Sequence, residues 1–479
     1  MSDPFSILPL AIAAGGGSVD GHPAAALVSA GLTLLQRGAP VVRALRGRRS
    51  AILLPTSPAF FTALGASDGR GAVLINPLAS PLEVAYQVAD AGVGAVFTNQ
   101  ALLARAPANL LRILLDDAPR SAGVILPGDF EPSATVDLGS HHPLELEGDP
   151  AVEGRDEEVA VVYTSAMAGR PLGAILTHRN LLANARSTVE AAGNSSDDHV
   201  LAVLPFSHLF GLTVTALAPL LAGARVTTMD RFNPRRATEL LETADVSEFV
   251  GVPAVFAGLL ALLARAGRRL DGGSLRLCIC GGAVLSPELQ DRWFEATGVE
   301  LRQGYGLTEG GPMCLFNRVS LPNQRGYLGV PFPGVDVEIR EPGTDRPLHA
   351  GIEGEICVRG ANVFSGYIGG SSDGLLVRDG WLGTGDRGIQ QPDGTVAFTG
   401  LYKAMFTRGG FNIYPAELER VVREMPGVRT ARVGAIFDPA RENEISMDVS
   451  GAVTRDGVEA WCSAHLSVYK QPAVITIVA

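Results

Sequence analysis

The chain has 479 residues, of which 46% are hydrophobic and 19% are charged. This length suggests about two to four domains or subdomains, and the composition excludes a chain that is disordered over most of its length. The formal net charge of −11 argues against general affinity for nucleic acid or for an anionic membrane surface. Five irregularly spaced cysteines and the lack of a long uncharged apolar run predict a cytoplasmic protein with neither a disulfide framework nor a membrane span.

Short β-rich runs alternate with longer Ala- and Leu-rich stretches over the first part of the chain. Strands are expected at 50–55, 94–99, 199–205, 224–229, 248–253 and 275–282. Helices are expected at 81–92, after the 199–205 strand to about Leu221, at 235–244, and at 286–298 with Ser286 as N-cap. This alternation predicts an α/β fold in which helices cover both faces of a parallel sheet.

The composition and the hydrophobic pattern of the sequence change near residue 325, where glycines, prolines and short alternating runs become frequent. These strands predict a small β-rich subdomain at about 325–400. Beyond Gly400, an amphipathic helix at 415–427 and strands at 430–437 and 445–451 form an α+β unit. We therefore expect a large N-terminal domain of layered α/β subdomains over 1–400, a hinge at about 401–403 and a small α+β C-terminal domain over 404–479.

A glycine-rich segment at 159–181 is the first part of the chain whose residues suggest a binding site. A β-branched run leads into two hydroxyl residues, a glycine- and proline-containing loop follows, and a helix is expected from Thr177. Hydroxyls and backbone N–H groups at such a turn can hold phosphate oxygens. The residues that could do so are Thr164, Ser165, Gly169 and Gly173. Taken alone, the segment fits an ordinary strand–loop connection equally well.

The same segment resembles the YTSGTTGxPKGV signature of the adenylate-forming (ANL) superfamily, which includes acyl- and aryl-CoA synthetases, luciferases and the adenylation domains of peptide synthetases. Four positions depart from that signature: Ala166 replaces a glycine, Met167 and Ala168 replace hydroxyl residues, and Leu172 replaces a lysine. These changes remove hydrogen-bond donors and a positive charge, so we expect weaker phosphate binding than is usual for the superfamily.

Two further segments resemble the superfamily's substrate-binding motifs. Residues 204–212 (LPFSHLFGL) resemble the part that shapes the acyl pocket, where His208 would lie beside the substrate carboxylate. Residues 280–289 resemble the loop that lies against adenine, and Gly281, Gly282 and Ala283 would allow close approach of the backbone to the base.

Residues 303–312 (QGYGLTEGGP) carry the most specific match. The resemblance implies that Tyr305, between Gly304 and Gly306, stacks on adenine. It also implies that Thr308 contacts the α-phosphate and that Glu309 binds Mg²⁺. An aromatic ring suits a base, a hydroxyl suits a phosphate, and a carboxylate suits a hard cation.

The last matches lie around the expected hinge. Residues 380–388 resemble the GWxxTGD segment, in which Asp386, expected in a glycine-rich turn, would accept hydrogen bonds from the ribose hydroxyls. In 400–419, Lys403 falls on the hinge position, and Gly409 and Gly410 would let the chain approach the pantetheine tunnel. Leu401 replaces an arginine that reaches ribose and phosphate in the superfamily, and Ala404 replaces an acidic residue.

Residues 465–479 resemble the run that precedes the superfamily's catalytic lysine loop. Lys470 matches the earlier lysine of a YKxP motif and does not stand in for the catalytic one. Because the sequence reaches only Ala479, we expect a shortened C-terminal domain without that lysine.

The resemblance implies an ATP-dependent carboxylic acid–CoA ligase that uses ATP, Mg²⁺ and CoA. The acid would be activated as acyl-AMP, and a thiol would take the acyl group after the C-terminal domain rotates. The apolar surroundings of His208 and Phe210 favour a hydrophobic acid, as in fatty acid metabolism. The candidate catalytic residues are Thr164, His208, Thr308 and Glu309. Two alternatives stay open: a weakened homologue that binds adenylates or acyl ligands, and a ligase whose acceptor is a phosphopantetheine carrier protein or an amine.

Overall fold

The computed structural model describes most of the chain. The described residues are 4–67, 71–117, 120–139, 144, 146, 149, 152–164, 170–270, 273–371, 374–375, 377–402, 404–438 and 441–478. Among the candidate site residues, Ser165, Gly169 and Lys403 lie outside these ranges.

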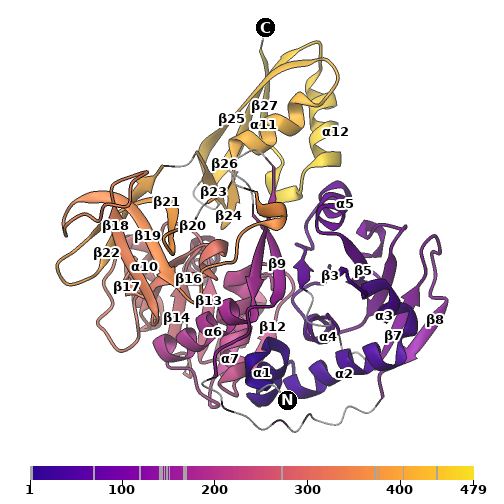
Figure 1. Cartoon of the computed structure of the whole chain (residues 1–479). Helices are drawn as coiled ribbons and strands as arrows, with labels where there is room; N and C mark the ends of the chain where they lie inside the picture. The colour runs from indigo at the N-terminus through magenta and orange to yellow at the C-terminus, as the bar shows by residue number, and fades with distance from the viewer. Residues whose placement is uncertain are drawn as a thin grey trace.

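The first of two large mixed sheets has the strand order β10-β9-β4-β3-β5-β6-β7-β8 (Figure 1). Strands β9, β4, β3, β5 and β6 run parallel, whereas β10 at one edge and β7 and β8 at the other are added antiparallel. Its strands are β3 (Arg49–Ile52), β4 (Ala72–Leu74), β5 (Val93–Thr98), β6 (Leu111–Leu115), β7 (Ser121–Ile125), β8 (Ala134–Asp137), β9 (Glu158–Thr164) and β10 (Leu172–Thr177).

The second large sheet has the order β17-β16-β15-β14-β13-β11-β12-β1-β2. It is parallel from β15 to β1 and antiparallel at both edges. Its strands are β1 (Ser18–Val19), β2 (His22–Pro23), β11 (His199–Ala202), β12 (Arg225–Thr228), β13 (Glu248–Gly251), β14 (Leu277–Cys280), β15 (Leu301–Gly306), β16 (Met313–Phe316) and β17 (Val330–Pro331).

Helices pack against both sheets, and four of them begin at a residue whose side chain caps the helix. Ser80 and Thr177 each form a capping box, with Glu83 and Asn180, and Ser286 accepts from Leu289 N–H as the expected N-cap. The helices of this part are α1 (Leu8–Ala14), α2 (Ala24–Arg37), α3 (Ala39–Leu45), α4 (Ala59–Gly65), α5 (Pro81–Asp90), α6 (His178–Ala192), π-helical η3 (Phe210–Leu217), α7 (Ala218–Leu221), α8 (Pro234–Thr243), α9 (Pro253–Arg265) and α10 (Pro287–Thr297).

Smaller sheets complete the molecule. The β-rich part contains β18 (Val335–Arg340), β19 (Glu353–Gly360), β20 (Val377–Arg378), β21 (Trp381–Gln390) and β22 (Val396–Leu401). The C-terminal part contains the hairpin β23 (Phe406–Arg408) and β24 (Phe411–Ile413), the sheet β25 (Val428–Asp438), β26 (Glu442–Gly451) and β27 (Val474–Val478), and helices α11 (Pro415–Arg423) and α12 (Arg455–His465). Figure 1 shows this C-terminal part in yellow above the other sheets, with α12 beside α5.

Two local expectations were wrong. The segment around Gly173 is not a loop, because Leu172–Thr177 pairs antiparallel with β9. Asp386 lies in strand β21 and not in a turn. The apolar helix expected to end near Leu221 does end there, as the π-helical η3 followed directly by α7. The sheets are also mixed and not wholly parallel, since their edge strands pair antiparallel with their neighbours.

No single helix in the described ranges combines the length and the apolar character needed to cross a bilayer. The pair Ala24–Arg37 and Ala39–Leu45 passes that test only when both helices are counted together, and it is bent by 92°.

The core histidine His178 makes stability depend on pH. It is 3% exposed, and its Nδ1 accepts a hydrogen bond from the Leu8 N–H at 3.0 Å. Burial lowers the pKa of His178 from 6.5 to about 4, because the imidazolium would lose its hydration. The unfolded chain therefore takes up this proton at a higher pH than the folded chain. The free energy of unfolding should fall by about 3 kcal/mol as the pH drops through the window between these two pKa values.

The variant His178→Gln keeps a hydrogen-bond acceptor and does not titrate. We expect its free energy of unfolding, measured by urea titration, to depend less on pH between 6.5 and 4 than that of the wild type. Equal pH dependence of the two proteins would contradict this assignment.

Candidate active site

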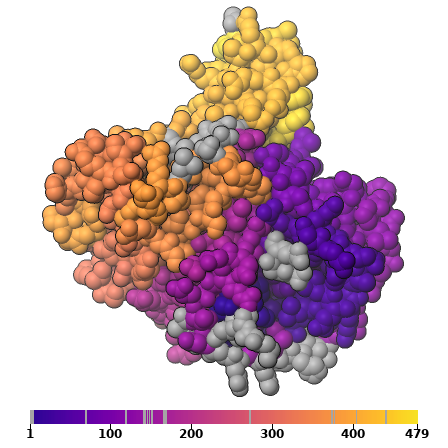
Figure 2. All heavy atoms as spheres, in the orientation of Figure 1, coloured from indigo at the N-terminus to yellow at the C-terminus, as the bar shows by residue number. Residues whose placement is uncertain are grey.

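A cavity of about 600 Å³ lies where the two large sheets, the β-rich part and the C-terminal hairpin meet. Its walls come largely from residues at or just beyond the carboxyl ends of β4, β9, β11, β14 and β15. Parallel strands bring these ends to one edge of a sheet, which is where ligands bind in open α/β folds. Figure 2 shows the C-terminal residues seated across the orange and violet parts of the surface.

Eleven of the residues that the sequence indicated line this cavity, within the part of the chain that the structure describes. They are Thr164, His208, Gly282, Ala283, Gly304, Tyr305, Gly306, Thr308, Glu309, Asp386 and Gly410. Gly173, Gly281 and Gly409 do not line it. A Cβ on Gly173 would lie 2.7 Å from Ile368 Cδ1, so this glycine serves packing against Ile368.

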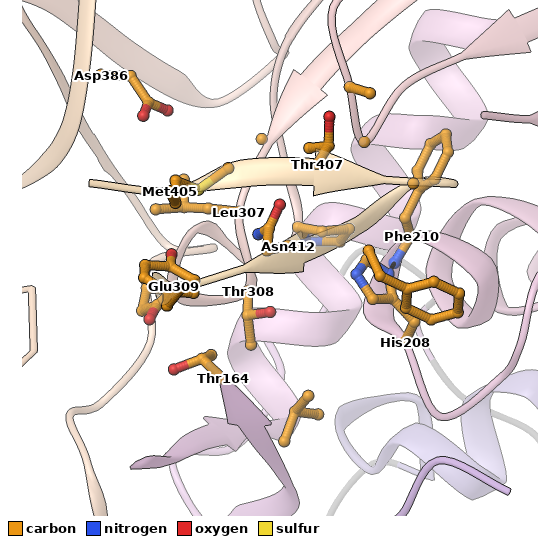
Figure 3. A pocket seen from close by; sticks show the side chains of 18 of the residues that line it. Thr164, His208, Phe210, Leu307, Thr308, Glu309, Asp386, Met405, Thr407 and Asn412 are labelled. Atoms are coloured by element: carbon orange, nitrogen blue, oxygen red, sulfur yellow. Dashed lines mark hydrogen bonds between the residues drawn. The ribbon is translucent and has the colours of Figure 1, made fainter. Parts of the chain in front are cut away.

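His208 and Phe210 form one end of the cavity (Figure 3). His208 is exposed to the cavity that it lines, and desolvation by the surrounding protein lowers its pKa. Its Nδ1 accepts a hydrogen bond from the Phe210 N–H at 3.3 Å, so the neutral ring carries its proton on Nε2. The Phe210 ring packs against Gly281, where a Cβ would lie 3.0 Å from Phe210 Cζ. This end therefore offers an apolar wall and one neutral N–H donor.

Tyr305 and Asp386 lie together at the other end. The Tyr305 hydroxyl donates to Asp386 Oδ2 at 2.7 Å, which joins β15 to β21. Burial, and then the charge of Asp386, raise the pKa of Tyr305, so this hydroxyl stays a donor. Gly282 has φ +77, which brings its backbone to the cavity in a conformation that suits glycine. The sequence indicated that Tyr305 and Asp386 both contact the nucleotide, but it did not indicate that they bind each other.

The short helix η4 (Thr308–Gly310) carries Thr308 and Glu309 into the cavity. The Tyr367 hydroxyl donates to Glu309 Oε1 at 2.6 Å and fixes the buried carboxylate. Just before η4, a Cβ on Gly306 would lie 1.7 Å from the Pro312 carbonyl oxygen, so only glycine fits where β15 shifts register against β16. Cys314 lies buried behind η4, and burial raises the pKa of its thiol to about 12.

Thr164 is the last residue of β9 and pairs with Leu172 on β10. Leu172 and Leu401 both line the cavity, at positions where the superfamily has cations. Among the lining residues that the structure describes, the carboxylates are Glu83, Glu309 and Asp386, and the only lysine or arginine is Lys470. Because Lys470 offsets the charge of Glu83, the acidic character of the described lining comes from Glu309 and Asp386.

The hairpin β23–β24 forms the remaining wall. A Cβ on Gly410 would lie 2.6 Å from Val252 Cγ1, and this residue has φ +81, so glycine allows the turn to pack against the large sheet. Figure 3 shows Thr407 and Asn412 on the hairpin strands, between Asp386 at one end and His208 at the other. The C-terminal part thus contributes side chains to the centre of the cavity.

The sequence did not indicate that Glu83, Tyr367 and Asn412 line the cavity. It also did not indicate that Lys470 lies there. The only local signal was the Ser80–Glu83 capping-box spacing, which marks a helix start and carries no information about a partner distant in the sequence.

The described residues contain no group of three or more His, Cys, Asp or Glu that could hold a metal ion by itself. Mg²⁺ commonly binds through one or two carboxylates together with waters and substrate phosphates. Glu309, fixed by Tyr367 inside the cavity, fits that second kind of site.

Comparison with known proteins supports the resemblance drawn from the sequence. A family model described as AMP-binding enzyme matches residues 42–368. Feruloyl-CoA synthase of an Amycolatopsis species is 31% identical over 440 residues, which cover 89% of this chain and 84% of that protein.

Two solved structures confirm the fold class. Malonyl-CoA ligase in a ternary product complex with methylmalonyl-CoA and AMP is 25% identical, with a TM-score of 0.78 over 98% of this chain and 96% of that one. ATP-bound MatB from Rhodopseudomonas palustris is 26% identical, with a TM-score of 0.66 over 95% and 88% of the two chains.

The geometry at His208 makes a spectroscopic prediction. We expect the ring to be neutral at pH 7 with its proton on Nε2, and to titrate below its usual pKa of 6.5. Nitrogen shifts of labelled histidine would report both properties, and the signal would be assigned by its loss in His208→Gln. A charged ring at pH 7, or a proton on Nδ1, would contradict the geometry.

Proposed function

Because the chain belongs to the family of AMP-binding enzymes, we propose that it is an ATP-dependent carboxylic acid–CoA ligase. In the first step a carboxylate oxygen attacks the α-phosphorus of ATP, and pyrophosphate leaves. In the second, the CoA sulfur attacks the acyl carbonyl of acyl-AMP, and AMP leaves. The observation that carries the proposal is one cavity with an apolar end at His208 and Phe210, a polar end at Tyr305 and Asp386, and Thr308 with Glu309 near its centre.

The acid would bind at the His208 end. Phe210 supplies an apolar surface, and the Nε2–H of a neutral His208 would donate to the substrate carboxylate without forming an ion pair. A neutral donor orients the nucleophile while leaving its charge available for attack. Relatives include feruloyl-CoA synthase. We therefore propose a hydrophobic carboxylic acid, aromatic or aliphatic, as the substrate class.

The nucleotide would bind at the other end. The backbone at Gly282 and Ala283 would lie against the base beside the Tyr305 ring, and Asp386 would accept from the ribose hydroxyls. Its Oδ2 already accepts from Tyr305, which fixes the carboxylate before the ribose arrives. Thr164 and Thr308 are the hydroxyls that would reach the α-phosphate, and Glu309 would hold a Mg²⁺ ion that offsets phosphate charge.

The thiol would enter beside the C-terminal hairpin, where Gly410 packs against Val252. The chain resembles the ligase complex that holds methylmalonyl-CoA and AMP, with a TM-score of 0.78 over 98% of this chain. This likeness supports the view that the arrangement seen here serves the second step. We also propose that the C-terminal domain begins after a hinge near 401–403, since its buried apolar side chains, from Ile413 to Ile475, form a cluster of their own. A cytoplasmic location remains a prediction.

A second candidate function follows from the charges of the residues that line the cavity. Leu172 and Leu401 leave the described part of the cavity acidic, which disfavours a polyanion such as ATP. A weakened homologue that binds adenylates or acyl ligands with little turnover would have such a cavity.

The deciding assay is pyrophosphate release with ATP, Mg²⁺ and a panel of aliphatic and aryl acids, each with CoA, with a phosphopantetheine thiol, with an amine or with no acceptor. Release that depends on one class of acid, with formation of the CoA thioester, is the expected result. Binding of acyl-AMP with no release for any acid would favour the weakened homologue. Faster product formation with an amine or a carrier thiol than with CoA would change the acceptor.

The acidity of the cavity predicts a gain of function. Leu172 lies opposite Thr164, and Leu172→Lys would return a cation to this wall. We expect the adenylation rate to rise by about ten- to a hundredfold, the equivalent of one hydrogen bond to a charged group. Leu172→Met changes the side chain without adding charge and is the control. Equal rates for the two variants would show that charge at this position does not limit adenylation.

A further inference from the structure

A buried ion pair joins the C-terminal part to the large part. Lys470 Nζ lies 3.0 Å from Glu83 Oε1 and 2.6 Å from Glu417 Oε1, with the Lys470 side chain 5% exposed and that of Glu83 13%. Glu417 belongs to the C-terminal helix α11, whereas Glu83 belongs to α5 of the large part. Lys470 therefore has one carboxylate partner in each body.

The Glu83 carboxylate is fixed before Lys470 reaches it. Its Oε2 accepts from the Ser80 N–H at 2.8 Å, within the capping box that begins α5. The same oxygen also accepts from the Ser467 hydroxyl of the C-terminal part. Burial opposes the charge of Glu83, but Lys470 and these hydrogen bonds hold its pKa below the usual range. The capping box therefore orients Glu83 from within the large part, and Lys470 and Ser467 complete its set of partners.

The segment that Glu83 holds is tied directly to the hairpin. Arg408 on β23 donates through Nη1 to the carbonyl oxygens of Tyr469, at 2.8 Å, and Gln471, at 3.0 Å, on either side of Lys470. The Phe411 ring on β24 stacks on the Tyr469 ring, with centroids 4.2 Å apart. A displacement of Lys470 would therefore move the hairpin, and with it Gly410, Thr407 and Asn412.

We propose that Glu83 is a positioning residue for thiol transfer, which holds the β23–β24 hairpin over the cavity by binding Lys470 and Ser467. Of the two contacts of Lys470, only the one with Glu83 depends on how the two parts are arranged, because Glu417 and Lys470 lie in the same small domain. Glu83 would thus select the arrangement of the second step and leave the first step untouched. This inference rests on the proposed function, since it assigns Glu83 to one of its two steps.

The test compares the half-reactions of Glu83→Gln. Pyrophosphate release without CoA measures the first, and thioester formation from supplied acyl-AMP and CoA measures the second. We expect the second to slow by about ten- to a hundredfold, as for the loss of a buried hydrogen bond to a charged group, and the first to stay within about twofold. Glu83→Asp, which keeps the charge, should restore part of the second rate.

A matched control is Glu158→Gln, which makes the same change at the Arg49–Glu158 ion pair wholly inside the large part. It should alter neither half-reaction. Equal slowing of both steps by Glu83→Gln would make Glu83 merely structural and overturn the proposal. So would unchanged rates in both steps.

A measurement without catalysis separates this proposal from the proposed function. Phe130 and Phe437 are each 79% exposed, one on each part, and all five native cysteines are buried. Spin labels at Phe130→Cys and Phe437→Cys would report the distance between the parts. We expect one narrow distribution for the parent protein and a broader or shifted one with Glu83→Gln. Identical distributions would overturn the proposal that Glu83 holds the two parts in this arrangement. Failure of the wild type to activate any acid would overturn only the ligase assignment.

Discussion

The geometry of the cavity depends on one ammonium group that water hardly reaches. Lys470 is buried between a carboxylate of its own domain and a carboxylate of the large part, and the hairpin that completes the cavity is attached to the residues beside it. Losing Glu83 would leave Lys470 paired with Glu417 alone and would remove its tie to the large part. Lys470 therefore ties the C-terminal part to the large part in the arrangement seen here.

The low-dielectric surroundings also affect the carboxylates inside the cavity. Carboxylates at Glu309 and Asp386 are fixed by tyrosine hydroxyls, so their positions are set before any ligand arrives. Such preset acceptors favour sugar hydroxyls and a cation, and they disfavour bare phosphate. With leucines at 172 and 401, Lys470 is the only lysine or arginine among the described lining residues that could offset the charge of a phosphate.

Much of the fold could be predicted because it rests on local signals. Buried parallel strands read as apolar runs, and Ser286 marks a helix start through its own hydroxyl. The motif residues were recognisable one by one, and eleven of the indicated positions line the cavity. Strand β10 was missed because glycine and proline before and within it read as a loop, although its pairing with β9 decides the matter. The Glu83–Lys470 contact joins residues 387 positions apart, so no local pattern could indicate it.

The five cysteines bear on the chemistry in another way. An acyl-adenylate is a strong acylating agent, and a protein thiolate nearby would compete with the incoming substrate thiol. Cys314 lies directly behind the helix that carries Thr308 and Glu309, yet its pKa of about 12 keeps it protonated and nearly inert at neutral pH. Burial does the same for Cys278, Cys280, Cys357 and Cys462. The protein can therefore retain its activated intermediate without acylating its own thiols.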